Sequence, residues 1–170
     1  MALERVRGCE TTPVARRGSQ PRTREDVERL CTPCDCPKGT RSGKRREDGT
    51  ERCWHLPEVL ADLVRFLFFS AWRVNEVRSL EWWNYFPRDG MIRLRPELSK
   101  NKRDRQLPVD RGELAAIVAR RLAARREHPE CPYSFHRNGA KVGDFRKAWA
   151  STCAAVRLAA GSCTISAGRV

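Results

Sequence analysis

A charged pair lies inside the most apolar stretch of the chain, "FLFFSAWRVNEVRSLEWW". Arg73 and Glu76 stand near its centre, where a core helix would tolerate neither charge without compensation. Because residues three apart on a helix lie on neighbouring surfaces, Glu76 can hold the guanidinium of Arg73 in place. A planar guanidinium can bind two phosphate oxygens and can stabilise the charge that develops on a phosphodiester during cleavage. Such a pair suits a phosphate-binding site, but an ordinary intrahelical pair at the edge of a core explains the two residues equally well when they are taken alone.

The composition indicates a polyanionic partner. The 170 residues include 34 Lys and Arg against 21 Asp and Glu, which gives a formal net charge of +13 and a pI near 10.1. Most of the excess lies in residues 91–160, which hold sixteen basic and seven acidic side chains. This balance favours nucleic acid as the partner, and the alternative is a basic protein that is merely soluble.

Two short stretches, "SKNKRDR" and "FHRNGAK", supply the basic side chains expected on the binding surface. A charge run is often only a solvated turn, and this alternative remains open for the first stretch. For the histidine of the second stretch we expect a surface position or a phosphate contact rather than catalysis. The residues predicted to bind DNA are Lys102, Arg103, Arg105, His136, Arg137 and Lys141.

The hydrophobic pattern predicts the elements that position these residues. Pro57 and the apolar residues that follow at helical spacing predict a buried helix that Ser70 stops, and a second helix is expected over about residues 71–80. After the turn signal "PRDG", residues 91–95 alternate apolar and charged side chains and read as a half-buried strand. "QLPV", residues 106–109, pairs with it, which gives an antiparallel hairpin with a basic tip.

Two more helices are predicted after the hairpin. Asp110 and Glu113 resemble a capping box for a helix that ends near Glu127, and Asp144 is expected to cap a last helix. The basic residues of the first of these helices are expected to point mostly outward: Arg120, Arg121, Arg125 and Arg126. The buried stripe of the last helix is predicted as Phe145, Ala148, Trp149, Thr152, Cys153 and Val156. The order of elements predicts a mostly helical α+β fold with helices around a small antiparallel sheet.

The rest of the chain is less regular. In residues 1–54 a short helix around residues 23–30 is the only local candidate, and the remainder is expected to be disordered or aberrant. The charged N-terminus does not resemble a signal peptide, and the most apolar window is too short and too charged to cross a bilayer. We therefore expect a soluble cytoplasmic protein without membrane contact, with a globular part over residues 55–160 and a divergent tail over residues 161–170.

The second half of the chain resembles a known family. "FSAWRVNEVRSLEWWNYFPRDGMIRLRPELSKNKRDRQLPV", followed by a helix and "FHRNGAKVGDFRKAW", is similar to the catalytic domain of tyrosine recombinases, the phage-integrase family. The resemblance runs from about Leu56 to Ala160 and is specific in the combination of its pieces. It implies the fold of the N-terminal part of that domain, double-stranded DNA as the partner and no cofactor. Intact family members assemble as oligomers on DNA.

The resemblance also implies roles for individual residues. A stretch of the type Thr-Gly-x-Arg-x-Gly-Glu supplies the first catalytic arginine and a supporting carboxylate in that family. The corresponding stretch here, "SAWRVNE", places Arg73 and Glu76 on those positions and replaces the two glycines by Ala71 and Asn75. The hairpin lysine of the family falls on Lys100, which would protonate the departing 5′ oxygen.

The resemblance stops at Ala160. Family members continue with a His-x-x-Arg box, a second His or Trp and a tyrosine nucleophile, and none of these follows here. Tyr85 and Tyr133 do not match the nucleophile and are predicted to be packing residues. The tail "GSCTISAGRV", read in an adjacent frame with permitted codons, can spell Val-His-Asp-Phe-Arg-Arg-Thr, which is typical of the missing box. We therefore interpret the tail as a frameshift product, a hypothesis that the coding DNA decides.

Cysteines of the N-terminal segment offer a further site. Cys31, Cys34, Cys53 and His55 are a possible set of zinc ligands, but Cys-x-His is a tight closing pair for a structural site, so incidental cysteines are favoured and no metal is expected.

Three hypotheses for the whole chain follow from these patterns. The leading one is a DNA-binding fragment of a tyrosine recombinase involved in DNA integration and site-specific recombination through a covalent 3′-phosphotyrosyl intermediate. This fragment would bind duplex DNA but would not cleave a strand by itself. The second is a non-enzymatic basic DNA-binding module, with or without a zinc knuckle, and the third is a pseudogene product without a stable fold.

Overall fold

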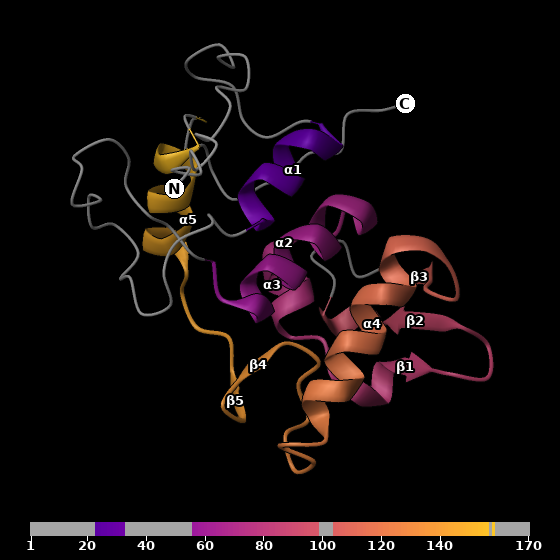
Figure 1. Ribbon diagram of the computed structural model, residues 1–170. Coiled ribbons are helices and arrows are strands. Elements are labelled where there is room, and N and C mark those ends of the chain that lie inside the picture. The colour runs from indigo at the N-terminus through magenta and orange to yellow at the C-terminus, as the bar shows by residue number, and fades with distance from the viewer. Residues whose placement is uncertain (1–22, 33–55, 99–103, 157, 159–170) are drawn as a thin grey trace, which may run out of the picture.

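The computed structural model describes residues 23–32, 56–98, 104–156 and 158. These residues form an α+β fold in which about half of them are helical (Figure 1). The α-helices are α1 (Arg24–Cys31), α2 (Glu58–Ser70), α3 (Val74–Arg78), α4 (Gly112–Arg125) and α5 (Arg146–Ala155), and the 3₁₀ turns are η1 (Trp82–Asn84) and η2 (Pro96–Leu98). The strands are β1 (Tyr85–Phe86), β2 (Met91–Leu94), β3 (Arg105–Pro108), β4 (His136–Arg137) and β5 (Ala140–Lys141). The predicted α+β class with a small antiparallel sheet is confirmed.

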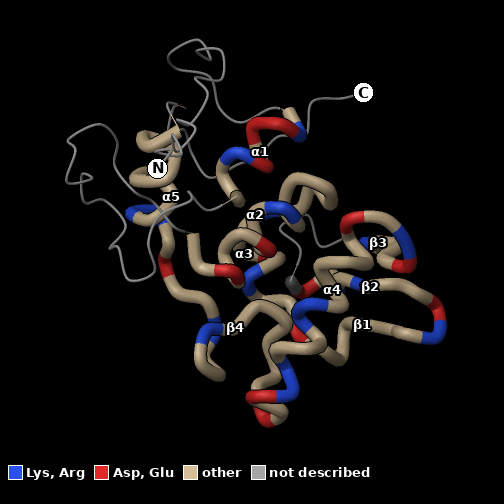
Figure 2. The backbone as a smooth tube through the Cα atoms, in the orientation of Figure 1, with Lys and Arg blue, Asp and Glu red and all other residues tan. Residues whose placement is uncertain are grey.

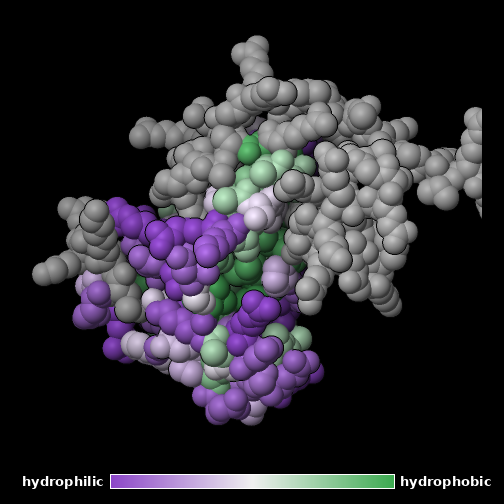
Figure 3. All heavy atoms as spheres, turned by 90° about the vertical axis from the view of Figure 1, so that its left-hand side faces the viewer, coloured by the Kyte–Doolittle hydropathy of each residue, from purple (hydrophilic) through white to green (hydrophobic). Residues whose placement is uncertain are grey.

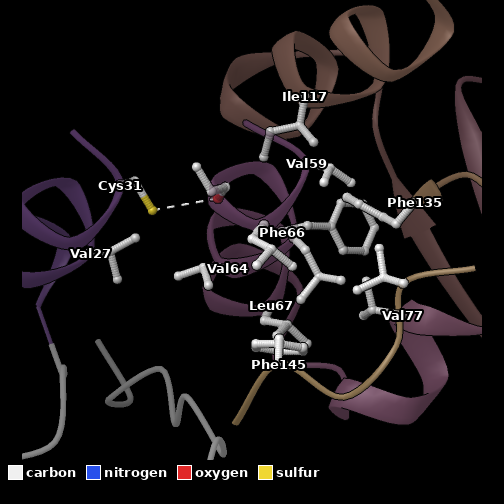
Figure 4. Packing of buried hydrophobic residues seen from close by; sticks show 14 of the residues in the cluster. Val27, Cys31, Val59, Val64, Phe66, Leu67, Val77, Ile117, Phe135 and Phe145 are labelled. Atoms are coloured by element: carbon white, nitrogen blue, oxygen red, sulfur yellow. Dashed lines mark hydrogen bonds between the residues drawn. The ribbon is translucent and has the colours of Figure 1, made fainter. Parts of the chain in front are cut away.

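Helix α2 is the centre of the core. Its apolar residues recur on several faces, so it contacts α1, α3 and α4 at once. In Figure 4, Val27 and Cys31 of α1 lie on one side of α2, while Ile117 of α4 lies on another. The most deeply buried apolar side chains of α2 are Leu63, Val64, Phe66 and Leu67. Burying each such side chain contributes about 1.5–3 kcal/mol, which explains why the predicted buried helix forms here.

The three-stranded sheet has the order β1-β2-β3 and is antiparallel throughout. The predicted hairpin is confirmed as β2 and β3, in the register Ile92↔Leu107 and Leu94↔Arg105. The third strand, β1, was not predicted, because two residues are too few to show an alternating pattern. Gly90 ends the turn between β1 and β2 with a φ of +60°, and an added Cβ would lie 2.6 Å from the Cβ of Asp110. Only glycine therefore fits this position.

The outer helices have the predicted apolar positions, but the predicted cap of the last helix is wrong, because Phe145 is the N-cap of α5 and the Asp144 carboxylate accepts hydrogen bonds from Arg146. Helix α1 begins at a capping box of Thr23 and Asp26 and buries Val27 and Leu30 completely. Four positions of the stripe predicted for α5 are buried and two are partly buried, in the order Phe145, Trp149, Thr152, Cys153, then Ala148 and Val156. The helix expected around residues 23–30 is thus present, and its contribution to the core was not foreseen.

The start of α4 corrects the predicted capping box. Helix α4 has Arg111 at its N-cap and no side-chain capping hydrogen bond. The carboxylate of Asp110 accepts hydrogen bonds from the Arg111 guanidinium, and Glu113 forms an ion pair with Arg24 of α1. Both carboxylates are therefore paired with arginines, and the arginine that pairs with Glu113 lies 89 residues earlier in the sequence. A local pattern cannot show such competition.

The surface of the described residues is mixed. Basic and acidic positions occur side by side along the helices and around the β1–β2 turn (Figure 2). On the face shown in Figure 3, hydrophobic side chains (green) are visible beside a hydrophilic area (purple). Among the described residues no helix is both long and apolar enough to span a membrane.

Candidate nucleic-acid interface

A sharp break between α2 and α3 positions Arg73. Ala71 ends α2 in the left-handed conformation, with a φ of 54°, and Ser70 Oγ accepts a hydrogen bond from the Trp72 N–H at 3.2 Å. Trp72 is buried, and its ring meets the Phe66 ring edge-on with 6.1 Å between the ring centres. The buried Trp72 therefore fixes the chain just before α3, where Arg73 is the N-cap and has an extended backbone. The second helix is consequently shorter than predicted, because residues 71–73 form the break rather than its first turn.

The buried carboxylate of Glu76 binds two arginines. Glu76 Oε2 accepts a hydrogen bond from the Arg73 backbone N–H at 2.9 Å and one from Arg105 Nη1 at 3.3 Å. Glu76 Oε1 accepts from Arg73 Nη1 at 3.4 Å. The side chain of Glu76 is 3% exposed, whereas those of Arg73 and Arg105 are 46% and 43% exposed. Each guanidinium is thus held by Glu76 on one side and is open to solvent on the other. Two arginines and one carboxylate give the site a net charge of +1.

This geometry changes the expectation for the charged pair. The sequence places both charges inside an apolar stretch, but only the carboxylate is buried and Arg73 is about half exposed. The second arginine was predicted as one of several basic residues at the hairpin tip, and not as a partner of Glu76. Its position follows from the register, because Leu94↔Arg105 is the last β2–β3 pair before the tip. Lys100, Lys102 and Arg103 lie outside the described residues.

The second basic stretch lies at the other end of α3. Lys141 Nζ is 2.8 Å from Ser79 Oγ and 5.2 Å from the centre of the Tyr133 ring, and Arg78 Nε donates to the Val142 carbonyl at 2.9 Å. Arg137 is exposed on the same hairpin, β4–β5. At about 1.5 Å per residue, the short helix α3 separates the two basic groups by only about 9 Å along its axis. The structure therefore places Arg105 of the first basic stretch and Lys141 of the second next to α3.

The expected surface position of His136 is wrong. His136 is 6% exposed, and its Nδ1 accepts a hydrogen bond from the Gly139 N–H at 3.4 Å. Burial, with the neighbouring His128 and Arg121, lowers the pKa of His136 below its usual range. A buried and neutral imidazole does not offer a cation to a phosphate. The side chain instead packs beneath the β4–β5 hairpin, with 5.5 Å between the centres of the His136 and His128 rings.

Cys31 is part of the core and not of an exposed metal site. Its Sγ donates a hydrogen bond to the Ala61 carbonyl at 3.4 Å (Figure 4), and burial raises the pKa of the thiol to about 12. Zinc binds the thiolate, so this environment disfavours Cys31 as a ligand. The other members of the predicted set, Cys34, Cys53 and His55, lie outside the described residues. Within the described part of the chain no three His, Cys, Asp or Glu side chains are grouped so that they could hold a metal ion.

A buried ion cluster between α2 and α4 was missed by the sequence reasoning. The side chain of Asp62 is 1% exposed and accepts from Arg120 Nε at 2.9 Å and Nη2 at 2.7 Å, while Arg121 Nε lies 2.8 Å from Asp62 Oδ2. Arg121 is buried and also pairs with Glu58, so its predicted outward position is wrong. The available signal was Asp62 itself, because a carboxylate within a buried helix requires a cation on the element that covers it.

The two tyrosines take part in packing contacts. Tyr85 meets the buried Trp82 edge-on at 6.4 Å between ring centres. The Tyr133 ring lies 5.2 Å from Lys141 Nζ, and the Tyr133 backbone forms a β-bridge with Glu81. Both side chains are partly buried. Their predicted packing role agrees with these contacts.

Comparison of the chain with models of protein families, with curated proteins and with solved structures gave no significant match. The functional interpretation therefore rests on the residues and their geometry.

The backbone of Ala71 yields a first testable prediction. We expect Ala71→Gly to raise the free energy of unfolding by about 0.5–1 kcal/mol, because a left-handed φ is strained for alanine and free for glycine. Urea unfolding followed by circular dichroism measures the change. The matched control is Asn75→Gly, at the position that corresponds to the second glycine of the family stretch. Asn75 lies inside α3, so this substitution should lower the free energy of unfolding by about 0.5 kcal/mol. A lower urea midpoint for Ala71→Gly would contradict the left-handed assignment.

Proposed function

We propose that this chain is a duplex-DNA-binding part of a tyrosine recombinase catalytic domain. Intact members of that family carry out DNA integration and site-specific recombination, and this chain, without a matching nucleophile, would bind DNA in the cytoplasm without cleaving it. The observation that carries the proposal is the pair of half-exposed guanidiniums of Arg73 and Arg105 on the buried Glu76.

The geometry suits a phosphodiester better than a small neutral ligand. Guanidinium groups present rigid, planar sets of N–H donors that match phosphate oxygens, and a carboxylate behind them keeps the donors aimed outward. Lys141 and Arg137 extend the positive surface past the other end of α3. A duplex carries phosphates along its whole length, so it can contact both groups at once.

The salt dependence of binding tests this proposal. We expect the affinity for a labelled duplex, measured by fluorescence anisotropy, to fall steeply between about 50 and 200 mM NaCl. Each phosphate contact contributes about 0.9 to the slope of log K against log salt, so Arg73→Gln/Arg105→Gln should reduce that slope by about 2. Binding of the unchanged chain that does not respond to salt would contradict the proposal.

A matched control separates this site from general positive charge. Arg126→Gln/Lys147→Gln removes the same charge from two exposed residues, the C-cap of α4 and a residue of α5. Neither residue has an ionic partner in the described part of the chain. The control should change the slope by much less than the site variant. Equal slopes for the two double variants would mean that net charge alone binds the DNA.

Strand cleavage is tested separately with a suicide substrate that traps a covalent protein–DNA adduct. No adduct is expected, since neither Tyr85 nor Tyr133 matches the position of the family nucleophile. An adduct would show that one of these tyrosines, or another side chain, serves as the nucleophile.

A further inference from the structure

The three-stranded sheet has a second face that the duplex-binding site does not use. Ile92 and Leu94 of β2 are buried toward the core, so Met91 and Arg93, which alternate with them, lie on the opposite face. Phe86 pairs with Met91 and therefore also lies on this outer face. Arg105 pairs with the buried Leu94 and belongs to the inner side of the sheet. The outer face is therefore separate from the Arg73–Glu76–Arg105 site.

Exposed aromatic rings and arginines gather on this outer face. Trp83 and Phe86, 45% and 37% exposed, are the large hydrophobic side chains that are exposed among the described residues. The guanidinium carbon of Arg95 lies 3.5 Å from the centre of the Trp83 ring, and that of Arg93 lies 4.4 Å from the centre of the Phe86 ring. We call these four residues the aromatic–arginine face.

The spacing of the two pairs is regular. Arg93 and Arg95 are two residues apart along and just beyond β2, so their side chains leave the strand on the same side. Two strand residues span about 6.6 Å. The face thus presents two aromatic–guanidinium units side by side instead of a single exposed ring.

The charges on the face favour an anionic partner. Arg93 is neutralised by Asp89, whose Oδ2 is 2.8 Å from Arg93 Nη2, and Glu81 accepts the indole N–H of Trp83. Arg95 is exposed and has no carboxylate partner among the described residues. One uncompensated guanidinium therefore lies over the largest exposed ring, in a chain with a net charge of +13.

We propose that the aromatic–arginine face binds single-stranded nucleic acid through its bases. Bases stack on aromatic rings and on guanidinium planes without regard to sequence, and a nearby arginine contacts the phosphate between them. Bases in a duplex are already stacked, so this face discriminates in favour of single strands. The site is independent of the proposed duplex binding at Arg73 and Arg105.

The test compares three labelled ligands with the full chain: an oligothymidylate, an abasic strand with the same number of phosphates, and a duplex. The oligothymidylate is expected to bind roughly tenfold more tightly than the abasic strand, because only the former can stack. Trp83→Ala/Phe86→Ala should lose at least about fivefold in affinity for the oligothymidylate and change duplex binding by less than about twofold. Trp83→Phe, which keeps a ring, should retain most of the affinity.

Controls make each outcome decisive. Arg73→Gln/Arg105→Gln should reduce the salt slope for the duplex and leave the preference for oligothymidylate over the abasic strand unchanged. Thermal unfolding identifies a variant that has lost its fold, in which case Arg95→Gln, at an exposed position, carries the test alone and should show at least about a threefold loss for oligothymidylate. Equal binding of the oligothymidylate and the abasic strand would overturn the proposal and would leave a protein as the partner class for this face.

Discussion

Replacement of Asp62 by alanine is expected to lower the free energy of unfolding by about 3–5 kcal/mol, because it removes the buried carboxylate partner of Arg121 and leaves only Glu58, which is 73% exposed. Domains of this size are stable by only about 5–15 kcal/mol, so the loss would leave the variant close to unfolding at room temperature. Arg120 is less affected, since 40% of its side chain is already exposed and it can turn toward water. Urea unfolding followed by circular dichroism measures the effect.

The double variant Asp62→Leu/Arg121→Met serves as the control. It replaces the buried pair by apolar side chains of similar size, and such exchanges are often neutral or stabilising. We therefore expect it to recover most of the stability that Asp62→Ala loses. If the double variant were as unstable as the single one, the ion pair would stabilise the fold more than apolar side chains of similar size do. The loss in Asp62→Ala could then not be explained by an unpaired Arg121 alone. Arg126→Met, at the exposed C-cap of α4, should change the stability by less than about 0.5 kcal/mol.

Elements defined by local patterns could be predicted from the sequence. The apolar spacing after Pro57 predicts α2, and the alternation in "MIRLR" predicts β2. The Asn-Gly pair in "FHRNGAK" is typical of a tight turn, and the structure has such a turn between β4 and β5. In that turn Asn138 and Gly139 both have positive φ, as tight hairpins require. In each case the residues that determine the element lie within it.

Side-chain partners from distant elements could not be predicted. Asp110 and Glu113 carry the sequence pattern of a capping box, but arginines compete for both carboxylates. Arg121 lies among basic residues expected to face outward, yet Asp62, 59 residues earlier, draws it into the core. The basic turn around His136 predicts a surface position or a phosphate contact, whereas the side chain is buried with the centre of the His128 ring 5.5 Å from its own. Pairing of this kind depends on the packing of α2 against α4 and of the hairpin against the core, which no local window contains.

In the candidate site, too, the local contact could be predicted and the contact between distant elements could not. The sequence motif identifies Arg73 and Glu76, since their spacing is local, and the structure shows them in contact. The contact from Arg105 to Glu76 depends on the β2–β3 register and on the position of the sheet beside α3. A residue predicted only as one charge in a basic run therefore becomes the second arginine of the site.

Replacement of Glu76 by alanine should affect both stability and DNA binding. The Arg73 backbone N–H would lose its acceptor at the N-cap of α3, and the buried side chain would leave a small cavity. Together these losses should lower the free energy of unfolding by about 2–3 kcal/mol. The two ion pairs add little to this value, because both arginines are about half exposed to solvent.

The conservative variant Glu76→Gln separates the two effects. Glutamine keeps the shape and one acceptor oxygen, so the stability should fall by only about 1 kcal/mol. If Glu76 aims Arg73 and Arg105 at phosphate, the salt slope for duplex binding should decrease even though the chain becomes more positive. If Glu76 only neutralises the arginines, removal of its charge should instead strengthen duplex binding and steepen the slope. The sign of the change therefore distinguishes a positioning carboxylate from a passive counter-ion, and we expect weaker binding because the two guanidiniums share no other anchor within the described part of the chain.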